Sequence, residues 1–103
     1  MPEIAYIVKL TANPGRRDEA LAALSKLVDA TESEPGTVQY VMHTDVADAD
    51  VIWFYERYAD QASFEAHIGS SAMAEAGGAL GGLLSAPPDM RAVEAVRSKG
   101  GAG

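Results

Sequence analysis

The sequence contains no cysteine among its 103 residues. Disulfide bonds and cysteine-based zinc sites are therefore excluded, and a chain this short must gain its stability from packing or from a partner subunit. Its two histidines, His43 and His67, lie too far apart in the sequence to form a recognisable set of metal ligands. We therefore expect no metal.

Basic residues are also scarce, with eight Lys and Arg against fifteen Asp and Glu and a net charge of −7. The acids are spread along the chain, so the sequence offers no basic surface for nucleic acid. It has no apolar run of about 18 residues and no export signal. We expect a cytoplasmic protein that binds neither nucleic acid nor membrane.

The apolar residues that are present follow regular periods. They alternate along residues 4–10, 38–43 and 51–58, which predicts three strands. Between Asn13, a candidate N-cap, and Pro35 they recur at helical spacing, which predicts a helix.

A second helix is expected after the third strand. Asp60 is its candidate N-cap, and Phe64, His67 and Ile68 are expected to point inward. The pattern is interrupted near Gly69, which predicts a break in this helix.

The predicted helix continues beyond the break. Ser71 is expected to cap a second segment that runs to about Leu84, and a last strand is expected over residues 90–96. Residues 1–98 are predicted to form a single domain, followed by a glycine-rich tail over residues 99–103.

The predicted order is β-α-β-β-α-β. With right-handed crossovers, it gives an α+β ferredoxin-like fold: a four-stranded antiparallel sheet with the helices on one face. The third strand is apolar on both faces, because Val51, Trp53 and Tyr55 alternate with Ile52 and Phe54. Something must cover the second face. We predict a homodimer in which two sheets pack face to face.

Four segments carry a resemblance to a known family. They are "ANPGRRDEALAALSKLV", "TESEPGTVQYVMHTD", "WFYERYADQASFEAHIGSS" and "PPDMRAVEAV". In order and spacing the chain resembles the antibiotic biosynthesis monooxygenase (ABM) domains of the dimeric α+β barrel superfamily. The resemblance implies a homodimer with a cavity between sheet and helices. Members of the family oxidise electron-rich aromatics such as anthrones and quinols with molecular oxygen, without metal or flavin, and some relatives cleave haem.

The chain departs from both kinds of relative. The positions that match the Asn, Trp and Tyr of anthrone-oxidising members hold Phe54, Tyr58 and Phe64. The haem-ligating histidine of haem-degrading relatives is missing around Gly77. These departures from the family disfavour haem degradation. The substrate that remains is a quinol-type or unassigned small aromatic compound, and no cofactor is expected.

The candidate catalytic residues are His67, Glu56 and Tyr58. His67 matches the "F-x-x-H" position of the family and suits proton transfer, but a core or interface histidine is an equal alternative. Glu56 lies on an apolar strand face, so it must find a partner or raise its pKa, and Arg57 points to the opposite face. A structural hydrogen bond to the backbone or a partner subunit is the alternative to a catalytic role.

Aromatic residues are the candidates for substrate contact. The expected substrate-binding residues are Tyr6, Tyr40, His43, Trp53, Phe54 and Phe64. The aromatic residues can instead be plain core residues, and His43, beside a polar turn, can be exposed or structural.

The second helical segment contains an unusual number of glycines: Gly77, Gly78, Gly81 and Gly82. Each costs about 1 kcal/mol relative to alanine in a helix, so this segment is predicted to be soft. It either borders the cavity and opens for substrate, or provides a small-residue face for close helix packing.

These observations give two expectations of function. The first is a cofactor-independent monooxygenase that oxidises a small quinol- or anthrone-like aromatic with molecular oxygen. The alternative is a non-catalytic dimeric protein that binds an aromatic or lipid-like metabolite.

Overall fold

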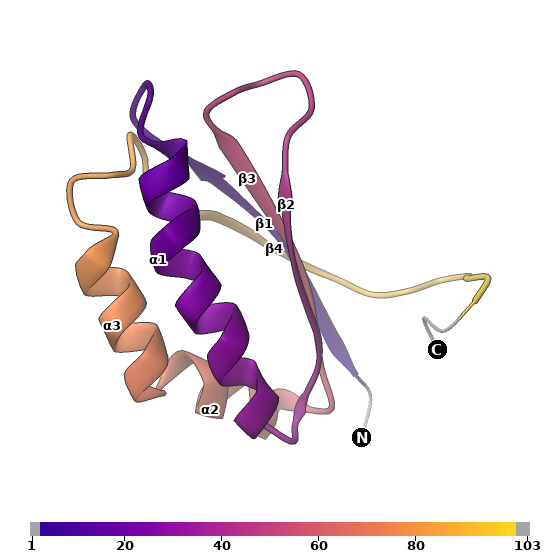
Figure 1. Cartoon of the computed structure of the whole chain (residues 1–103). Coiled ribbons are helices and arrows are strands. Elements are labelled where there is room, and N and C mark those ends of the chain that lie inside the picture. Colours follow the sequence, from indigo (N-terminus) through magenta and orange to yellow (C-terminus); the bar gives the residue numbers. More distant parts are fainter. Residues whose placement is uncertain (1–2, 101–103) are drawn as a thin grey trace.

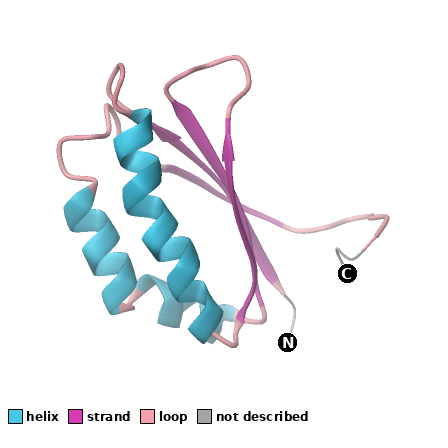
Figure 2. Cartoon of the chain, in the orientation of Figure 1, coloured by secondary structure: helices cyan, strands magenta, loops and turns pink. Residues whose placement is uncertain are grey.

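A computed structural model describes residues 3–100 of the chain. The elements follow the order β1 (Ile4–Thr11), α1 (Arg17–Ala30), a 3-10 turn η1 (Thr31–Ser33), β2 (Thr37–Thr44), β3 (Val51–Tyr58), α2 (Gln61–Ile68), α3 (Ser71–Ala79) and β4 (Asp89–Val93). The strands form one antiparallel sheet in the order β2-β3-β1-β4, and the helices lie on one of its faces (Figures 1 and 2). The predicted α+β ferredoxin-like fold is confirmed.

Strand pairing decides which side chains meet beneath the helices. β1 and β3 pair without a break, so that Tyr6 lies opposite Glu56 and Val8 lies opposite Phe54. On the other side of β3, Tyr40 lies opposite Glu56. Because paired residues share a face, these side chains all point toward the helices.

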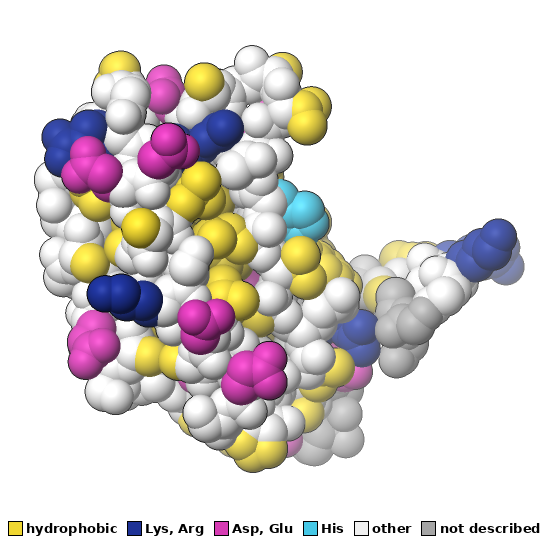
Figure 3. Space-filling model, in the orientation of Figure 1, with side chains coloured by type: hydrophobic (Ala, Val, Ile, Leu, Met, Phe, Trp, Pro, Cys, Tyr) yellow, Lys and Arg dark blue, Asp and Glu magenta, His cyan; other side chains and the backbone are white. Residues whose placement is uncertain are grey.

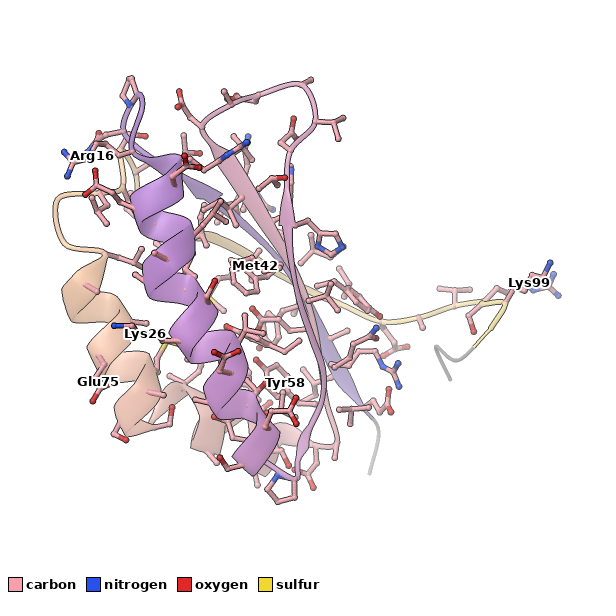
Figure 4. The ribbon with its side chains drawn as sticks, in the orientation of Figure 1. Arg16, Lys26, Met42, Tyr58, Glu75 and Lys99 are labelled. Carbon is pink, nitrogen blue, oxygen red and sulfur yellow. The ribbon has the colours of Figure 1, made fainter. Side chains whose placement is uncertain are left out.

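The hydrophobic core lies between this face and the helices α1 and α3. Its buried members are Val8, Leu10, Ala20, Leu24, Leu27, Ile52, Phe54 and Ala76. Met42 and Tyr58 also extend from the sheet toward the helices (Figure 4). Hydrophobic side chains remain visible at the surface in a strip beside α1 (Figure 3), so the helices do not close the core completely.

The start of α1 differs from the prediction. Asn13 does not cap this helix, because its Nδ2 donates to the carbonyl oxygen of Gly82, 2.9 Å away. The chain first makes a turn in which Gly15 adopts a φ of 77°, a value that glycine accepts without strain. The helix therefore begins only at Arg17, and no side chain caps it.

The break between α2 and α3 was predicted correctly, and so was one of the two N-cap residues. Asp60 caps α2, since its Oδ1 accepts a hydrogen bond from the Ser63 backbone N–H at 2.8 Å. The cap of α3 is Ser70 rather than Ser71, and its Oγ accepts from the Met73 N–H at 3.2 Å.

The helix α3 ends at Ala79, five residues before the predicted Leu84. Two glycines follow, and Gly82 has a φ of 78°, which no helix continues through. The prediction was wrong here because the apolar spacing of the leucines persists through a segment whose backbone has already left the helix.

The last strand is also shorter than predicted, since it ends at Val93 rather than Val96. Residues 94–100 are exposed and extend away from the sheet (Figure 1). Most of the predicted glycine-rich tail, residues 101–103, lies outside the described residues. Within residues 3–100, no helix is long and apolar enough to cross a membrane.

The face of the sheet opposite the helices is uncovered in the single chain, and it carries apolar side chains beside charged ones such as Lys9 and Arg57. Ile7 and Val93 are 40% and 38% exposed, and Val41, Trp53 and Tyr55 are only partly buried. The homodimer that would cover this face stays a prediction.

Candidate functional site

A cavity of about 190 Å³ lies between the sheet and all three helices. Its walls come from strands β1 to β4 and from α1, α2 and α3. Among the side chains that line it, only Tyr40, Glu56 and His67 carry polar atoms that can form strong hydrogen bonds. The cavity therefore suits an apolar ligand that is recognised by a few polar groups.

The cavity has a buried end and an exposed edge. Glu56 and His67 are 5% and 2% exposed, whereas Ile68 and Met90 are 45% and 46% exposed. Ile68, which was expected to point inward, does line the cavity, but at its exposed edge. The polar groups are thus at the protected end of an apolar space.

His67 is held at the buried end by an acid from another element. Its Nδ1 lies 2.8 Å from Oε1 of Glu34, the residue that follows η1. The hydroxyl of Thr37 donates to the same oxygen at 2.8 Å. The other ring nitrogen, Nε2, is buried and has no hydrogen-bond partner among residues 3–100. Such an atom calls for an explanation, because nearly all buried polar atoms are paired.

Glu34 also faces the outside of the molecule. Its side chain is 21% exposed, and together with His67 it lines a surface hollow near Pro35, Gly36 and Ser63. Glu34 does not line the cavity itself. The Glu34–His67 pair therefore stands between the cavity and the hollow.

Glu56 finds its partner on its own strand. The hydroxyl of Tyr58, two residues further on and on the same face, donates to Glu56 Oε1 at 2.6 Å. The expectation of a backbone or partner-subunit group is thus not what the single chain shows. Burial raises the pKa of Glu56, against the hydrogen bond from Tyr58, which lowers it.

Aromatic rings enclose these polar groups. The ring centroid of His67 lies 4.8 Å from that of Tyr40 and 5.4 Å from that of Tyr58. Burial is the largest cause that raises the pKa of both tyrosines, and the Glu56 carboxylate raises it further. Both phenols therefore stay protonated, so neither is a base. The Tyr58 hydroxyl donates to Glu56.

Most of the predicted site residues come together around the cavity. His67, Glu56, Tyr40, Phe54 and Phe64 line it. Tyr58 and Tyr6 lie behind this lining: Tyr58 orients Glu56, and the ring of Tyr6 stacks on Phe64 with centroids 4.4 Å apart.

Two predicted substrate contacts lie elsewhere. His43 and Trp53 are on the opposite face of the sheet, beside an open depression. The indole Nε1 of Trp53 donates to Asp45 at 2.8 Å, and the ammonium of Lys9 lies 5.6 Å from the ring centroid of Trp53. Alternation along β2 and β3 explains the placement, since neighbouring strand residues point to opposite faces.

Glu34 is the site residue that sequence reasoning missed. It precedes Pro35-Gly36, and these residues were interpreted as the end of a helix and as part of a family segment, with no role for Glu34 itself. The available signal was a buried histidine with no partner nearby in the sequence. Glu34 and His67 are 33 residues apart in the sequence, so no local pattern indicates that they are in contact.

The glycine-rich segment borders the cavity through Ala76, Gly77 and Leu80. Gly78, Gly81 and Gly82 do not line it. The mobility of this segment stays a prediction. Among residues 3–100, no group of three or more His, Asp or Glu side chains is placed to hold a metal ion.

Comparisons with known proteins agree with this architecture. The family model described as "Antibiotic biosynthesis monooxygenase" matches residues 4–78. The structure is similar to that of PA3566 from Pseudomonas aeruginosa, with a TM-score of 0.87, 23% sequence identity, and coverage of 94% of this chain and 97% of the other.

Further solved structures share the fold. The protein NE2512 from Nitrosomonas europaea, described as of unknown function, has a TM-score of 0.83 and 26% identity, with coverage of 100% of this chain and 98% of the other. Rv0793 from Mycobacterium tuberculosis has a TM-score of 0.84 and 23% identity, with coverage of 93% and 97%. A search of curated protein sequences finds no match.

Proposed function

Because this chain belongs to the antibiotic biosynthesis monooxygenase family, we propose that it is a monooxygenase that hydroxylates a small hydroquinone with molecular oxygen and needs no metal or flavin. The observation that carries the proposal is the buried, unpaired Nε2 of His67 beside an apolar cavity. An imidazole nitrogen in such a place suits the acceptance of a proton from a bound phenol.

The size of the cavity narrows the substrate. Its volume of about 190 Å³ compares with roughly 150 Å³ for a cavity that takes up benzene. A single substituted ring or a compact fused pair fits this space, whereas the three fused rings of an anthrone exceed it unless the walls move. Size therefore favours a quinol over an anthrone.

Removal of a proton is the step that the residues support best. When His67 Nε2 takes the proton of one hydroxyl group of the hydroquinone, the substrate becomes an electron-rich phenolate that can reduce oxygen. A positioned base of this kind contributes about 10²–10⁴-fold to a rate. The apolar lining disfavours water, which would otherwise intercept the reduced oxygen species.

The reaction balances without an external reductant. The hydroquinone supplies all the electrons: one oxygen atom replaces a ring hydrogen as a hydroxyl group, and the other leaves as water. The organic product is the hydroxylated quinone. The protons of the water come from the substrate, so a group that accepts a proton and later returns it is sufficient.

Glu56 offers a second polar group to the same substrate ring. It lines the cavity, and Tyr58 fixes one of its carboxylate oxygens. Its second oxygen is then available for the other hydroxyl of a hydroquinone. Two hydroxyls on one ring would thus meet two oriented polar groups in an otherwise apolar space.

Oxygen uptake by the purified, chelator-treated protein tests this proposal. The panel comprises one-ring and two-ring hydroquinones and a three-ring anthrone, with autoxidation subtracted. We expect uptake with the smaller compounds that falls at least about 100-fold in His67→Gln. His43→Gln is the matched control, because His43 lies on the opposite face, and it should keep the activity.

A non-catalytic binding protein is the second candidate. Phe54 and Phe64 occupy two positions where anthrone-oxidising members carry polar side chains, and this favours binding without turnover. Saturable binding of a hydroquinone without oxygen uptake above background would support this alternative and contradict the first.

We also propose that two copies of the chain pack through the uncovered face of the sheet. Its exposed apolar side chains, which include Ile7 and Val93, support this assembly. Light scattering at micromolar concentration should give the mass of a dimer. A monomer would contradict the proposal.

A further inference from the structure

We infer that Glu34 is a positioning residue, which holds His67 in the tautomer that carries its proton on Nδ1. Nε2 is then left as the acceptor for a hydroxyl group of the substrate. The identity of that substrate rests on the proposed function, but the tautomer is a property of the protein alone.

The contact between the two side chains determines the direction of the hydrogen bond. Glu34 Oε1 lies 2.8 Å from His67 Nδ1. A carboxylate has no hydrogen to donate, so Nδ1 must be the donor. A neutral imidazole has one N–H, and the nitrogen without it carries a free lone pair. Nε2 is therefore an acceptor, and it is the atom that lacks a partner among residues 3–100.

The carboxylate is itself held in place. The hydroxyl of Thr37 donates to the same Oε1 at 2.8 Å, so this oxygen accepts two hydrogen bonds from two elements. Its position does not depend on His67 alone. Glu34 can thus orient the imidazole ring instead of following it.

The backbone around Glu34 is built for close approach to α2. A Cβ atom added to Gly36 would overlap the side chain of Ser63, so only glycine permits the present distance between this loop and the helix. The hydroxyl and backbone N–H of Ser63 both bond Asp60 at the helix start. The loop that carries Glu34 is therefore packed directly against the helix that carries His67.

The charge of Glu34 also helps His67 to accept a proton. When Nε2 takes a proton, the imidazole becomes positively charged in a mostly apolar surrounding, and an adjacent carboxylate favours this charged form. Glu34 keeps contact with solvent through the surface hollow, since its side chain is 21% exposed. Its charge is therefore not buried in the core together with that of His67.

A purely structural histidine predicts a different arrangement. If His67 only stabilised the core, both ring nitrogens would be expected to have partners, because an unpaired buried acceptor costs free energy. One nitrogen is paired with an acid and the other is left open beside a cavity. This asymmetry is what a proton acceptor requires.

Nitrogen NMR of the labelled, ligand-free protein tests the inference. Two-bond ¹⁵N–¹H correlations of the His67 ring distinguish a proton on Nδ1 from one on Nε2. We expect the Nδ1–H tautomer in the wild type. In Glu34→Gln the side-chain amide can either accept from Nδ1–H or donate to a bare Nδ1, so the exclusive preference should be lost and the Nε2–H tautomer should appear. Glu32→Gln is the matched control: it makes the same charge change at an exposed position two residues earlier, and the tautomer should stay as in the wild type.

Kinetics provide the second readout. With a turned-over hydroquinone, Glu34→Gln should lower kcat by about 10²-fold or more and change KM by only a few fold, because the substrate still fits the cavity. A wild-type proton on Nε2 would overturn the inference, and so would a Glu34→Gln variant that keeps both the tautomer and kcat. If that variant does not fold, the wild-type spectrum still decides.

The two proposals fail separately. If the tautomer changes as expected but no compound on the panel is oxidised, the monooxygenase is refuted and the role of Glu34 in orienting His67 stands. If oxidation occurs and depends on His67 but the wild-type proton is on Nε2, the enzyme stands and the role of Glu34 is refuted.

Discussion

Replacement of Tyr58 by phenylalanine tests the polar group that supports Glu56. The hydroxyl of Tyr58 donates to Glu56 Oε1 at 2.6 Å, and the two side chains are 0% and 5% exposed. A hydrogen bond to a charged group contributes about 1.5–3 kcal/mol, and its loss leaves a buried carboxylate oxygen unsatisfied. We therefore expect Tyr58→Phe to lower the free energy of unfolding by about 1.5–3 kcal/mol at neutral pH.

The loss of stability should depend on pH. Burial raises the pKa of Glu56 above its ordinary value of 4.5, whereas the hydrogen bond from Tyr58 lowers it. With a raised pKa, the contribution of Glu56 to stability is fully present below its unfolded pKa and is lost as pH rises through its folded pKa. Tyr58→Phe removes a lowering effect, so the folded pKa rises further. The stability difference between the two proteins should be smallest in acid and should grow as pH increases.

Urea unfolding followed by tryptophan fluorescence measures this difference. Wild type and variant are compared at equal protein concentration, because a dimer gains apparent stability from association. In acid, the difference in unfolding free energy between wild type and variant should be about 0.5–1.5 kcal/mol, which is typical of a neutral hydrogen bond. At neutral pH it should reach about 1.5–3 kcal/mol, which is typical of a hydrogen bond to a charged group. A difference that is constant across pH, or that decreases as pH rises, would refute the assignment of a buried carboxylate held by Tyr58.

Three further substitutions test the local structure. Gly36→Ala should lower stability by about 1–3 kcal/mol, because the new Cβ overlaps Ser63; an unchanged urea midpoint would contradict the close packing of this loop. Gly77→Ala, whose Cβ would meet no atom within 4 Å, should instead raise stability by about 1 kcal/mol and slow hydrogen exchange in α3. Ser70→Ala removes the cap that accepts from Met73 and should cost about 1 kcal/mol, measured by thermal unfolding; no loss would place the cap elsewhere.

The overall fold was predictable because its strands and helices carry distinct periods. Alternation along residues 51–58 predicted β3 with its observed bounds. The same alternation placed Glu56 and Arg57 on opposite faces, and in the structure Arg57 bonds Glu3 and Gln39 rather than Glu56. Signals that depend on a few neighbouring residues were thus sufficient for the sheet.

Helix ends were less predictable, because several residues can perform the same local task. Ser70 and Ser71 are chemically equivalent as caps, and only tertiary packing decides between them. Asn13 has the right side chain for a cap but bonds Gly82, which is 69 residues away. The end of α3 was missed because leucine spacing outlasts the helix.

The candidate site was also only partly predictable, because it depends on contacts between residues far apart in the sequence. His67 was identified from its place in a short motif, but its partner Glu34 comes from a loop 33 residues earlier. No local pattern predicts that two such residues meet. The assignment to the substrate site followed from residue type for Trp53 and from a match to the family for His43. Strand pairing in the structure places both on the other face.

Incorporation of labelled oxygen tests the central claim most directly. The purified, chelator-treated protein is given ¹⁸O₂ and a one-ring hydroquinone, and the product is examined by mass spectrometry. The account predicts a hydroxylated quinone that carries one ¹⁸O atom, formed by the wild type and lost in His67→Gln. Quinone without label, or labelled product formed no faster than without protein, would contradict a monooxygenase built around His67.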